Sequence, residues 1–306
     1  MVNADARTRW PARAPRKRRP GVSWFFLAPA LVAYAAVVLI PSLGGAAFAF
    51  TDWNGLAPDL SFVGWANFQR AWSDTQVRSA LAVTAIFAIA ITVFQNALGL
   101  ALALLLNTSI RSRNWLRTVM FAPVVVTPVI VAYLWKYLLS THGAVNRVAS
   151  FLGMTDGSIN WLGDPALAMV SVVVVTVWQT MGVAMVIYLA GLQNIPQELY
   201  EAADMDGASA STKFRLITFP LLAPAVTINV VLSTVNGLKL FDQVFVLTNG
   251  GPGYATETLS TLVYKTSFIV GEFGYATAIA SAMTVFVAAV SMGLMARLKR
   301  REAHVH

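Results

Sequence analysis

The sequence predicts an all-α integral membrane protein with six transmembrane helices, on the basis of its composition, its apolar runs and the placement of its basic residues. The 306 residues are 57% hydrophobic and only 12% charged, whereas a soluble domain is about 25% charged. Six apolar runs are each long enough to cross about 30 Å of hydrocarbon as a helix. These runs are too long, and alternate too little, for the strands of a β-barrel.

The six predicted spans leave little chain outside the membrane, so no separate soluble domain fits. We expect one transmembrane domain over residues 21–306, with its core at about 75–297. Residues 1–20 are rich in proline and charge, which predicts a disordered basic tail. The first apolar run is longer than that of a signal peptide, which favours an uncleaved anchor. The predicted spans are residues 24–48, 80–106, 115–139, 166–190, 221–247 and 275–297.

Basic residues gather on one side of the predicted spans. Most of the 22 lie in the tail, between spans two and three, in a polar segment between spans four and five, or after span six. Cytoplasmic loops of membrane proteins carry such an excess of Lys and Arg, so both termini are expected in the cytoplasm. This placement also accounts for the net charge of +8 without a nucleic-acid partner.

The sequence shows no pattern that would support catalysis or metal binding. It has no cysteine, which excludes disulfides, thiolate chemistry and cysteine metal sites. Its three histidines are isolated from one another or lie in the terminal tail. No glycine-rich loop ending in Gly-Lys-Ser or Gly-Lys-Thr is present to hold nucleotide phosphates. We therefore expect that the chain is not an enzyme and binds neither a metal nor a cofactor.

The polar segment 198–220 interrupts the apolar chain and has the pattern of a helix, a turn and a second helix. Asn194 is expected to cap the first helix and Pro196 to lie in its first turn. Glu201 lies near the positive end of the helix dipole, where an acid is favourable. Gly207 is expected to end this helix, because glycine readily adopts a positive φ.

The second helix of this segment is expected to begin near Ser209 or Ser211. It carries Phe214 and Ile217 before Pro220 opens the next span. A short helix with a face of small residues, held at the membrane surface, suits insertion into a groove of a partner protein. The segment is therefore interpreted as a docking element.

The string EAADMDGA and the residues after it resemble the EAA motif of binding-protein-dependent ABC importer permeases. The family pattern is EAA, three variable positions, Gly, about nine variable positions, and then Ile-x-Leu-Pro; Phe219 stands at the usual Leu position. The resemblance implies a type I importer permease fold with a cytoplasmic coupling helix between spans four and five. The ATPase-coupling residues that it implies are Glu201, Ala202, Ala203, Asp206, Gly207, Ile217 and Pro220.

Further strings are similar to the carbohydrate-uptake branch of this family. They are KLFDQVFVLTNGGPGYATET, FGYATAIASAM and DWNG…FVGWANF. They look most like the first of the two permeases in transporters of the maltose or glycerol-phosphate type. Together the resemblances cover about residues 50–290.

The resemblance implies a set of partners in a bacterial plasma membrane. A second homologous permease would complete a central pathway, and a dimeric cytoplasmic ABC ATPase would hold the coupling helix in a cleft. An extracytoplasmic binding protein would deliver a sugar. ATP and Mg would be used by the ATPase, since this chain has no phosphate-binding loop.

Polar residues inside apolar spans are costly and often functional. Asn229, Ser233, Asn236 and Gln243 fall near one stripe of the fifth predicted span, where amides could bind sugar hydroxyls. Bonding between helices uses the same residue types and is an equal alternative. For Lys239 and Asp242, an i, i+3 pair or snorkelling near the outer interface is favoured over a role in binding. The substrate-pathway candidates are Asn229, Ser233, Asn236, Lys239, Asp242, Gln243, Trp178 and Tyr188.

Two other classes of protein compete with an importer subunit. A stand-alone secondary transporter of small solutes would commonly show acidic residues within its spans, but only Asp242 falls inside one, near its end. A membrane enzyme would need a convergent acid, base or metal cluster, and none is visible.

Overall fold

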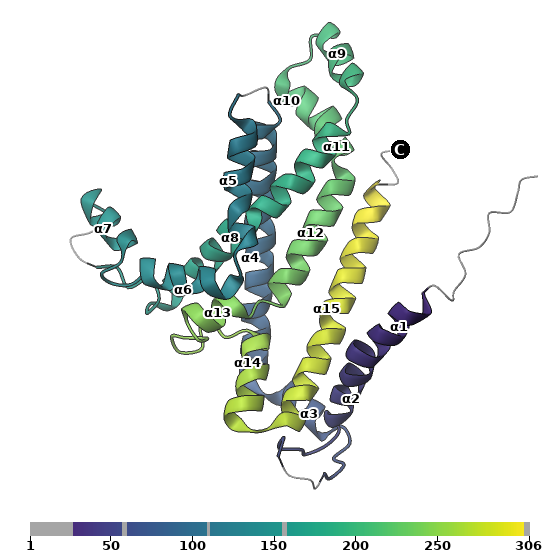
Figure 1. The fold of residues 1–306 in the computed structure, drawn as a ribbon, viewed down its shortest axis with the longest axis vertical. Helices are drawn as coiled ribbons and strands as arrows, with labels where there is room; N and C mark the ends of the chain where they lie inside the picture. The colour runs from purple at the N-terminus through teal and green to yellow at the C-terminus, as the bar shows by residue number, and fades with distance from the viewer. Residues whose placement is uncertain (1–26, 57–59, 109–110, 155–157, 303–306) are drawn as a thin grey trace, which may run out of the picture. The chain divides into compact units, whose positions relative to one another are not determined.

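Helices make up almost all of the computed structural model, which describes residues 27–56, 60–108, 111–154 and 158–302 (Figure 1). Within these residues, strand pairing is limited to a bridge between Thr51 and Phe62. The predicted tail 1–20 lies outside the described residues.

The chain divides into two compact units, residues 1–45 and residues 46–306. In the first, the apolar run forms helices α1 (Ala28–Tyr34) and η2 (Ala35–Leu39) and most of α2 (Ile40–Phe48). Together these helices make a candidate span of 21 residues.

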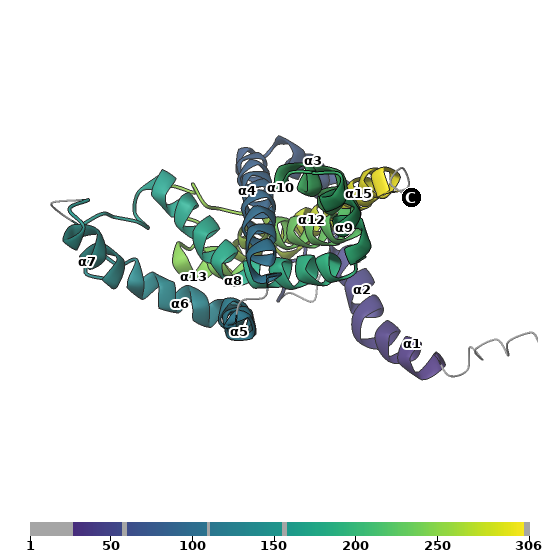
Figure 2. The same cartoon turned by 90° about the horizontal axis from the view of Figure 1, so that it is seen from above.

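Three long helices of the second unit are also candidate membrane spans. They are α4 (Thr75–Leu106), α8 (Pro165–Gln193) and α15 (Phe273–Glu302). Helix α4 packs against α8, and α12 (Ala223–Leu238) packs against α4 and α15 (Figures 1 and 2). Two bent helix pairs complete the set, and if each pair counts as one span there are six among the described residues. The predicted all-α, six-span fold is confirmed in this form.

The third predicted span, residues 115–139, is not one straight helix. It consists of α5 (Arg113–Val125) and α6 (Pro128–Leu138), which meet at 99°. Thr127 is extended, with ψ 142°, because the ring of a proline excludes the helical conformation from the residue before it. Helix α6 therefore runs away from the axis of α5 (Figure 1).

The fifth predicted span, residues 221–247, is wrong at both ends. Its helix starts earlier, as α10 (Ala210–Lys213), η3 (Phe214–Thr218) and α11 (Phe219–Leu221), and then bends by 67° into α12. Helix α12 ends at Leu238, and a separate helix, α13, follows (Asp242–Leu247). At this break the Thr258 hydroxyl donates to the Leu240 carbonyl over 3.0 Å, so a carbonyl outside the helices still has a donor within the protein.

Shorter helices occupy the connections. They are α3 (Ala66–Ser73), α7 (Ala144–Phe151), α9 (Gln197–Met205), α14 (Leu259–Lys265) and η4 (Thr266–Val270).

Small residues let the long helices approach each other closely. A Cβ added to Gly99 of α4 would lie 2.5 Å from the Cβ of Ala184 in α8. A Cβ on Gly237 of α12 would lie 2.7 Å from the Cα of Ala88 in α4. Helices in a bilayer associate through such close packing, because lipid tails provide no hydrophobic drive between them. Both crossings therefore fix where α8 and α12 lie on α4.

A polar cluster joins α3, α4 and α15 at the end of the bundle that carries α3. Asp74 caps α4 by accepting from the Gln76 N–H over 2.8 Å, and it accepts from the Tyr275 hydroxyl over 2.7 Å. Arg70 pairs with Glu272 over 2.8 Å and lies 3.9 Å above the Tyr275 ring. Burial raises the pKa of Asp74, but these hydrogen bonds outweigh burial and hold the pKa below its ordinary value. This contribution to stability is present above the ordinary carboxyl pKa and is lost as the pH falls.

The closeness of α4 and α8 yields a stability prediction. Gly99→Ala should lower the free energy of unfolding by about 1–3 kcal/mol, because the new methyl group meets Ala184. The matched control is Gly293→Ala on α15, whose added Cβ meets nothing within 4 Å. That variant should be neutral or more stable, because Ala favours a helix by about 1 kcal/mol over Gly. Thermal unfolding of both purified variants in the same detergent measures the difference, and equal losses would contradict close packing at Gly99.

Candidate functional site

The polar segment 198–220 begins with helix α9, at the end of the bundle where α15 finishes (Figures 1 and 2). The expected role of Asn194 is wrong: it caps the C-terminus of α8, and its N–H donates to the carbonyls of Gly191 and Leu192. The residue before α9 is Pro196, which makes no side-chain cap. Asn suits both ends of a helix, and the apolar run of α8 extends further than expected.

The turn after α9 has the predicted glycine geometry. Gly207 has φ +70°, and its N–H donates to the Asp204 carbonyl over 3.1 Å. The next N–H, of Ala208, reaches the Ala203 carbonyl over 2.9 Å. This pair of bonds is the Schellman motif, which closes a helix end and reverses the chain. A Cβ on Gly207 would meet nothing within 4 Å, so only the backbone conformation requires glycine here.

Two contacts brace α9 against the helices that follow it. The hydroxyls of Tyr200 and Thr218 lie 2.9 Å apart, and Thr218 is buried. Lys213 pairs with Asp204 over 2.6 Å, an exposed pair that orients more than it stabilises. Ser209 caps α10 by accepting from the Thr212 N–H over 3.2 Å, which confirms one of the two expected starts. Because α10 continues through η3 and α11 into α12, α9 is attached to a long helix of the bundle.

The surface of α9 is acidic and apolar. Met205 is 89% exposed and Leu199 is 42% exposed. Within the described part of the chain, Glu201 and Asp206 make no ion pair, and both are exposed. Of the other expected coupling residues, Ala202 and Gly207 are exposed, whereas Ala203, Ile217 and Pro220 are half-buried. Exposed apolar side chains beside unpaired charges are typical of a surface that a partner covers.

The buried pathway candidates lie in a hydrogen-bond network centred on Asn96 of α4. The Tyr188 hydroxyl donates to Asn96 Oδ1 over 2.7 Å, and Asn96 Nδ2 donates to Ser233 Oγ over 2.9 Å. Asn229 Nδ2 donates to the Ala184 carbonyl over 3.2 Å. The network joins α4, α8 and α12. These side chains therefore make hydrogen bonds between helices, which is the alternative to binding a sugar. Asn96 is not among the candidates above, although an amide within an apolar run is the signal for such a residue.

The other pathway candidates do not form the expected stripe. Helix α12 ends at Leu238, Lys239 is its C-cap, and Asp242 is the first residue of α13. The prediction that Lys239 and Asp242 are i, i+3 neighbours on one helix is therefore wrong. They form no ion pair within the described residues. Gln243 also leaves the stripe of α12 and donates to Gln179 Oε1 over 3.1 Å. Asn236 is exposed, and Trp178 packs edge-on against Trp135 with ring centres 5.4 Å apart.

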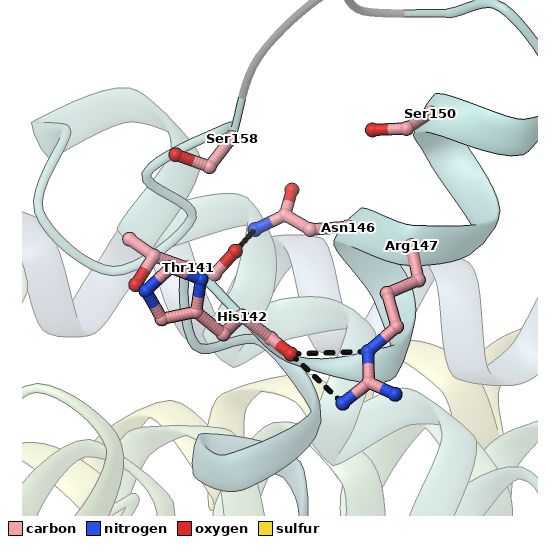
Figure 3. A pocket seen from close by; sticks show the side chains of 6 residues that line it. All are labelled: Thr141, His142, Asn146, Arg147, Ser150 and Ser158. Carbon is pink, nitrogen blue, oxygen red and sulfur yellow. Dashed lines mark hydrogen bonds between the residues drawn. The ribbon is translucent and has the colours of Figure 1, made fainter.

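A polar pocket of about 430 Å³ lies apart from both sets of residues (Figure 3). Asn146, one of its lining residues, is buried and donates to the Thr141 carbonyl over 3.1 Å. Arg147 donates twice to the His142 carbonyl, over 3.3 and 3.2 Å. None of the described residues that line the pocket is a carboxylate. Its lining residues are Thr141, His142, Asn146, Arg147, Ser150 and Ser158.

No group of His, Cys, Asp or Glu among the described residues could hold a metal ion. The geometry instead defines a multi-pass helical membrane protein with a braced, exposed helix at one end of its bundle. Residues 95–304 match the family described as binding-protein-dependent transport system inner membrane component. The chain therefore belongs to this family, and it is a membrane component of a transport system that works with a binding protein.

Relatives resemble this chain over nearly its whole length. The probable starch degradation products transport system permease protein AmyD of Thermoanaerobacterium thermosulfurigenes is 35% identical, covering 92% of this chain and 95% of the relative. The trehalose/maltose transport system permease protein MalF of Thermococcus litoralis is 34% identical, covering 88% and 91%. The lactose transport system permease protein LacF of Rhizobium radiobacter is 33% identical, covering 92% and 95%.

A solved structure confirms the fold. A chain of a bacterial ABC transporter involved in the import of the acidic polysaccharide alginate superposes with a TM-score of 0.79 at 23% identity, covering 90% of this chain and 94% of that chain. The same type of transporter in complex with an alginate pentasaccharide-bound periplasmic protein gives 0.75 at 22% identity.

The brace between Tyr200 and Thr218 yields a prediction about local order. Tyr200→Phe removes one hydrogen bond, which contributes about 0.5–1.5 kcal/mol. Hydrogen exchange of the α9 amides should therefore quicken about two- to tenfold. Tyr137→Phe, at a tyrosine that is 70% exposed on α6, is the control and should leave α9 unchanged. Unchanged exchange in Tyr200→Phe would show that the brace does not hold α9.

Proposed function

We propose that this chain is a permease subunit of an ATP-driven sugar importer and that the polar segment 198–220 is its coupling element. Helix α9 would sit in a cleft of a dimeric cytoplasmic ABC ATPase, and a second homologous permease would complete the pathway. The observation that most supports this role is that α9 is exposed on its outer side and braced on its inner side by the contact between Tyr200 and Thr218.

The proposed mechanism is alternating access without chemistry on the substrate. Closure of the ATPase dimer on ATP and Mg would displace α9, and the brace would pass this displacement to α12. Helix α12 contacts α4 and α8 through Ser233, Asn229 and the Asn96 network. A shift of α12 would therefore rearrange the centre of the bundle, where a pathway has to open.

Two observations support a carbohydrate as the substrate. The relatives named above are transport permeases for starch degradation products, for trehalose or maltose, and for lactose. The chain also carries the NGGPGYATET string typical of the carbohydrate-uptake branch. An extracytoplasmic binding protein would deliver this sugar to the end of the bundle opposite α9.

The charge distribution supports a cytoplasmic position for α9 and for both termini. The connection from α4 to α5 carries Arg111, α5 begins with Arg113, α10 carries Lys213, and the end of α15 carries Arg297 and Lys299. All of these elements lie at the same end of the bundle as α9 (Figure 1). Excess basic charge marks the cytoplasmic side.

The proposal predicts that the conformation of Gly207 is essential for transport. Gly207→Ala forces a left-handed conformation on a residue with a side chain, at a cost of about 1–2 kcal/mol. ATP-dependent sugar uptake into proteoliposomes should fall about tenfold, since a change of 1.4 kcal/mol corresponds to a factor of ten. The protein should still insert and fold.

Gly153→Ala is the matched control. Gly153 has φ +67°, open space around its Cβ and the same pair of closing bonds, but it follows α7. It should insert equally well and retain uptake. Equal uptake by both variants would contradict the coupling role of the segment. Uptake that stops when the proton gradient is dissipated with ATP present would instead indicate a secondary transporter.

A further inference from the structure

Two breaks in the helices of the bundle, between α5 and α6 and between α12 and α13, are linked through one residue of α8, Gln179. Its side chain is 3% exposed and uses both ends of its amide. Gln179 Nε2 donates to the Val126 carbonyl over 2.9 Å, and Gln179 Oε1 accepts from Gln243 Nε2 over 3.1 Å. Val126 lies at the bend between α5 and α6, and Gln243 lies just after the break between α12 and α13.

The first bond meets a requirement of the bend. Val126 caps α5 and, with Thr127, is extended before Pro128. Because these two residues are extended rather than helical, the regular ladder of hydrogen bonds stops here. A carbonyl freed inside an apolar span needs another donor, which Gln179 supplies.

The second bond fixes the direction of the amide. Because Gln179 donates to a carbonyl through its nitrogen, its oxygen is left to face Gln243. Gln243 is 6% exposed and lies in the first turn of α13. Two consecutive hydrogen bonds thus run from one break to the other. If either glutamine is removed, a buried amide loses its partner, which is costly where water is excluded.

The helices beyond the two breaks are also joined to each other. Lys136 of α6 donates to the Val246 carbonyl in the last turn of α13 over 2.9 Å. Val131 of α6 and Val244 of α13 belong to the same buried apolar cluster. Helices α6 and α13 therefore form one packed body.

We infer that Gln179 and Gln243 are positioning residues that make the bend between α5 and α6 and the break between α12 and α13 move together during transport. This inference rests on the proposed function, since α12 is the helix that would receive the displacement of α9. The amide pair extends that path from the end of α12, through Gln243 and Gln179, to Val126.

Gln95 of α4 provides a matched control. It is 5% exposed, and its Nε2 donates to the carbonyl of Thr180, the residue after Gln179, over 3.3 Å. Its amide thus donates to a backbone carbonyl as that of Gln179 does, and among the described residues it makes no hydrogen bond to either break. Gln95→Met and Gln179→Met each replace a buried amide by an apolar side chain of similar shape.

The test uses the assembled transporter in lipid nanodiscs, with hydrogen exchange as the first measurement. Gln179→Met and Gln243→Met should each quicken exchange several-fold at residues 124–131 and also at residues 239–246. The double variant should quicken it no more than the stronger single variant. Gln95→Met should affect neither stretch. Exchange that changes at only one of the two stretches in either variant, or changes equally in Gln95→Met, would overturn the inference.

The second measurement is the amount of sugar imported per ATP hydrolysed. It should fall several-fold in Gln179→Met and Gln243→Met, no further in the double variant, and not in Gln95→Met. Linked exchange with an unchanged import ratio would overturn the role in transport. A wild-type complex that hydrolyses ATP but imports no sugar would contradict the proposed function instead, while the exchange data would still decide whether the breaks are linked.

Discussion

In the apolar layer of a membrane, every backbone N–H and C=O must find a partner within the protein. The second unit of this chain breaks two of its spans and meets that requirement with side chains. The Gln179 amide serves Val126 at one break, and the Thr258 hydroxyl serves Leu240 at the other. These donors allow helices α6 and α13 to leave the direction of the bundle without leaving these carbonyls unpaired.

Close packing complements these bonds. Gly99 and Gly237 bring α8 and α12 against α4, and the Asn96 network holds the three helices in register. A displacement of α12 therefore alters several buried contacts at once. Because α12 continues from the braced segment that contains α9, a displacement of the proposed coupling element is passed through α12 to the centre of the bundle.

The sequence predicts the features that depend on local composition. Long apolar runs identify the spans, and Gly207 and Ser209 identify the turn after α9 and the start of α10. Pro128 is a visible signal for the bend after α5, but it lies within an apolar run that also suits a straight helix. The break at Lys239–Phe241 contains neither Pro nor Gly, and its hydrogen bond from Thr258 comes from a distant part of the chain. For the same reason the sequence places Gln243 on the stripe of the fifth predicted span, although its partner lies on α8.

The central claim, that a partner covers α9, can be tested by cysteine labelling, because the chain contains no cysteine. Ala202→Cys places a thiol on the exposed surface of α9, and Phe151→Cys places one at a residue that is 89% exposed on α7. Each variant is treated with a hydrophilic maleimide, alone and with its ATPase partner assembled, in a detergent that leaves both ends accessible. Assembly should slow labelling at residue 202 at least tenfold and leave residue 151 unchanged. Equal labelling of residue 202 in both states would contradict the claim.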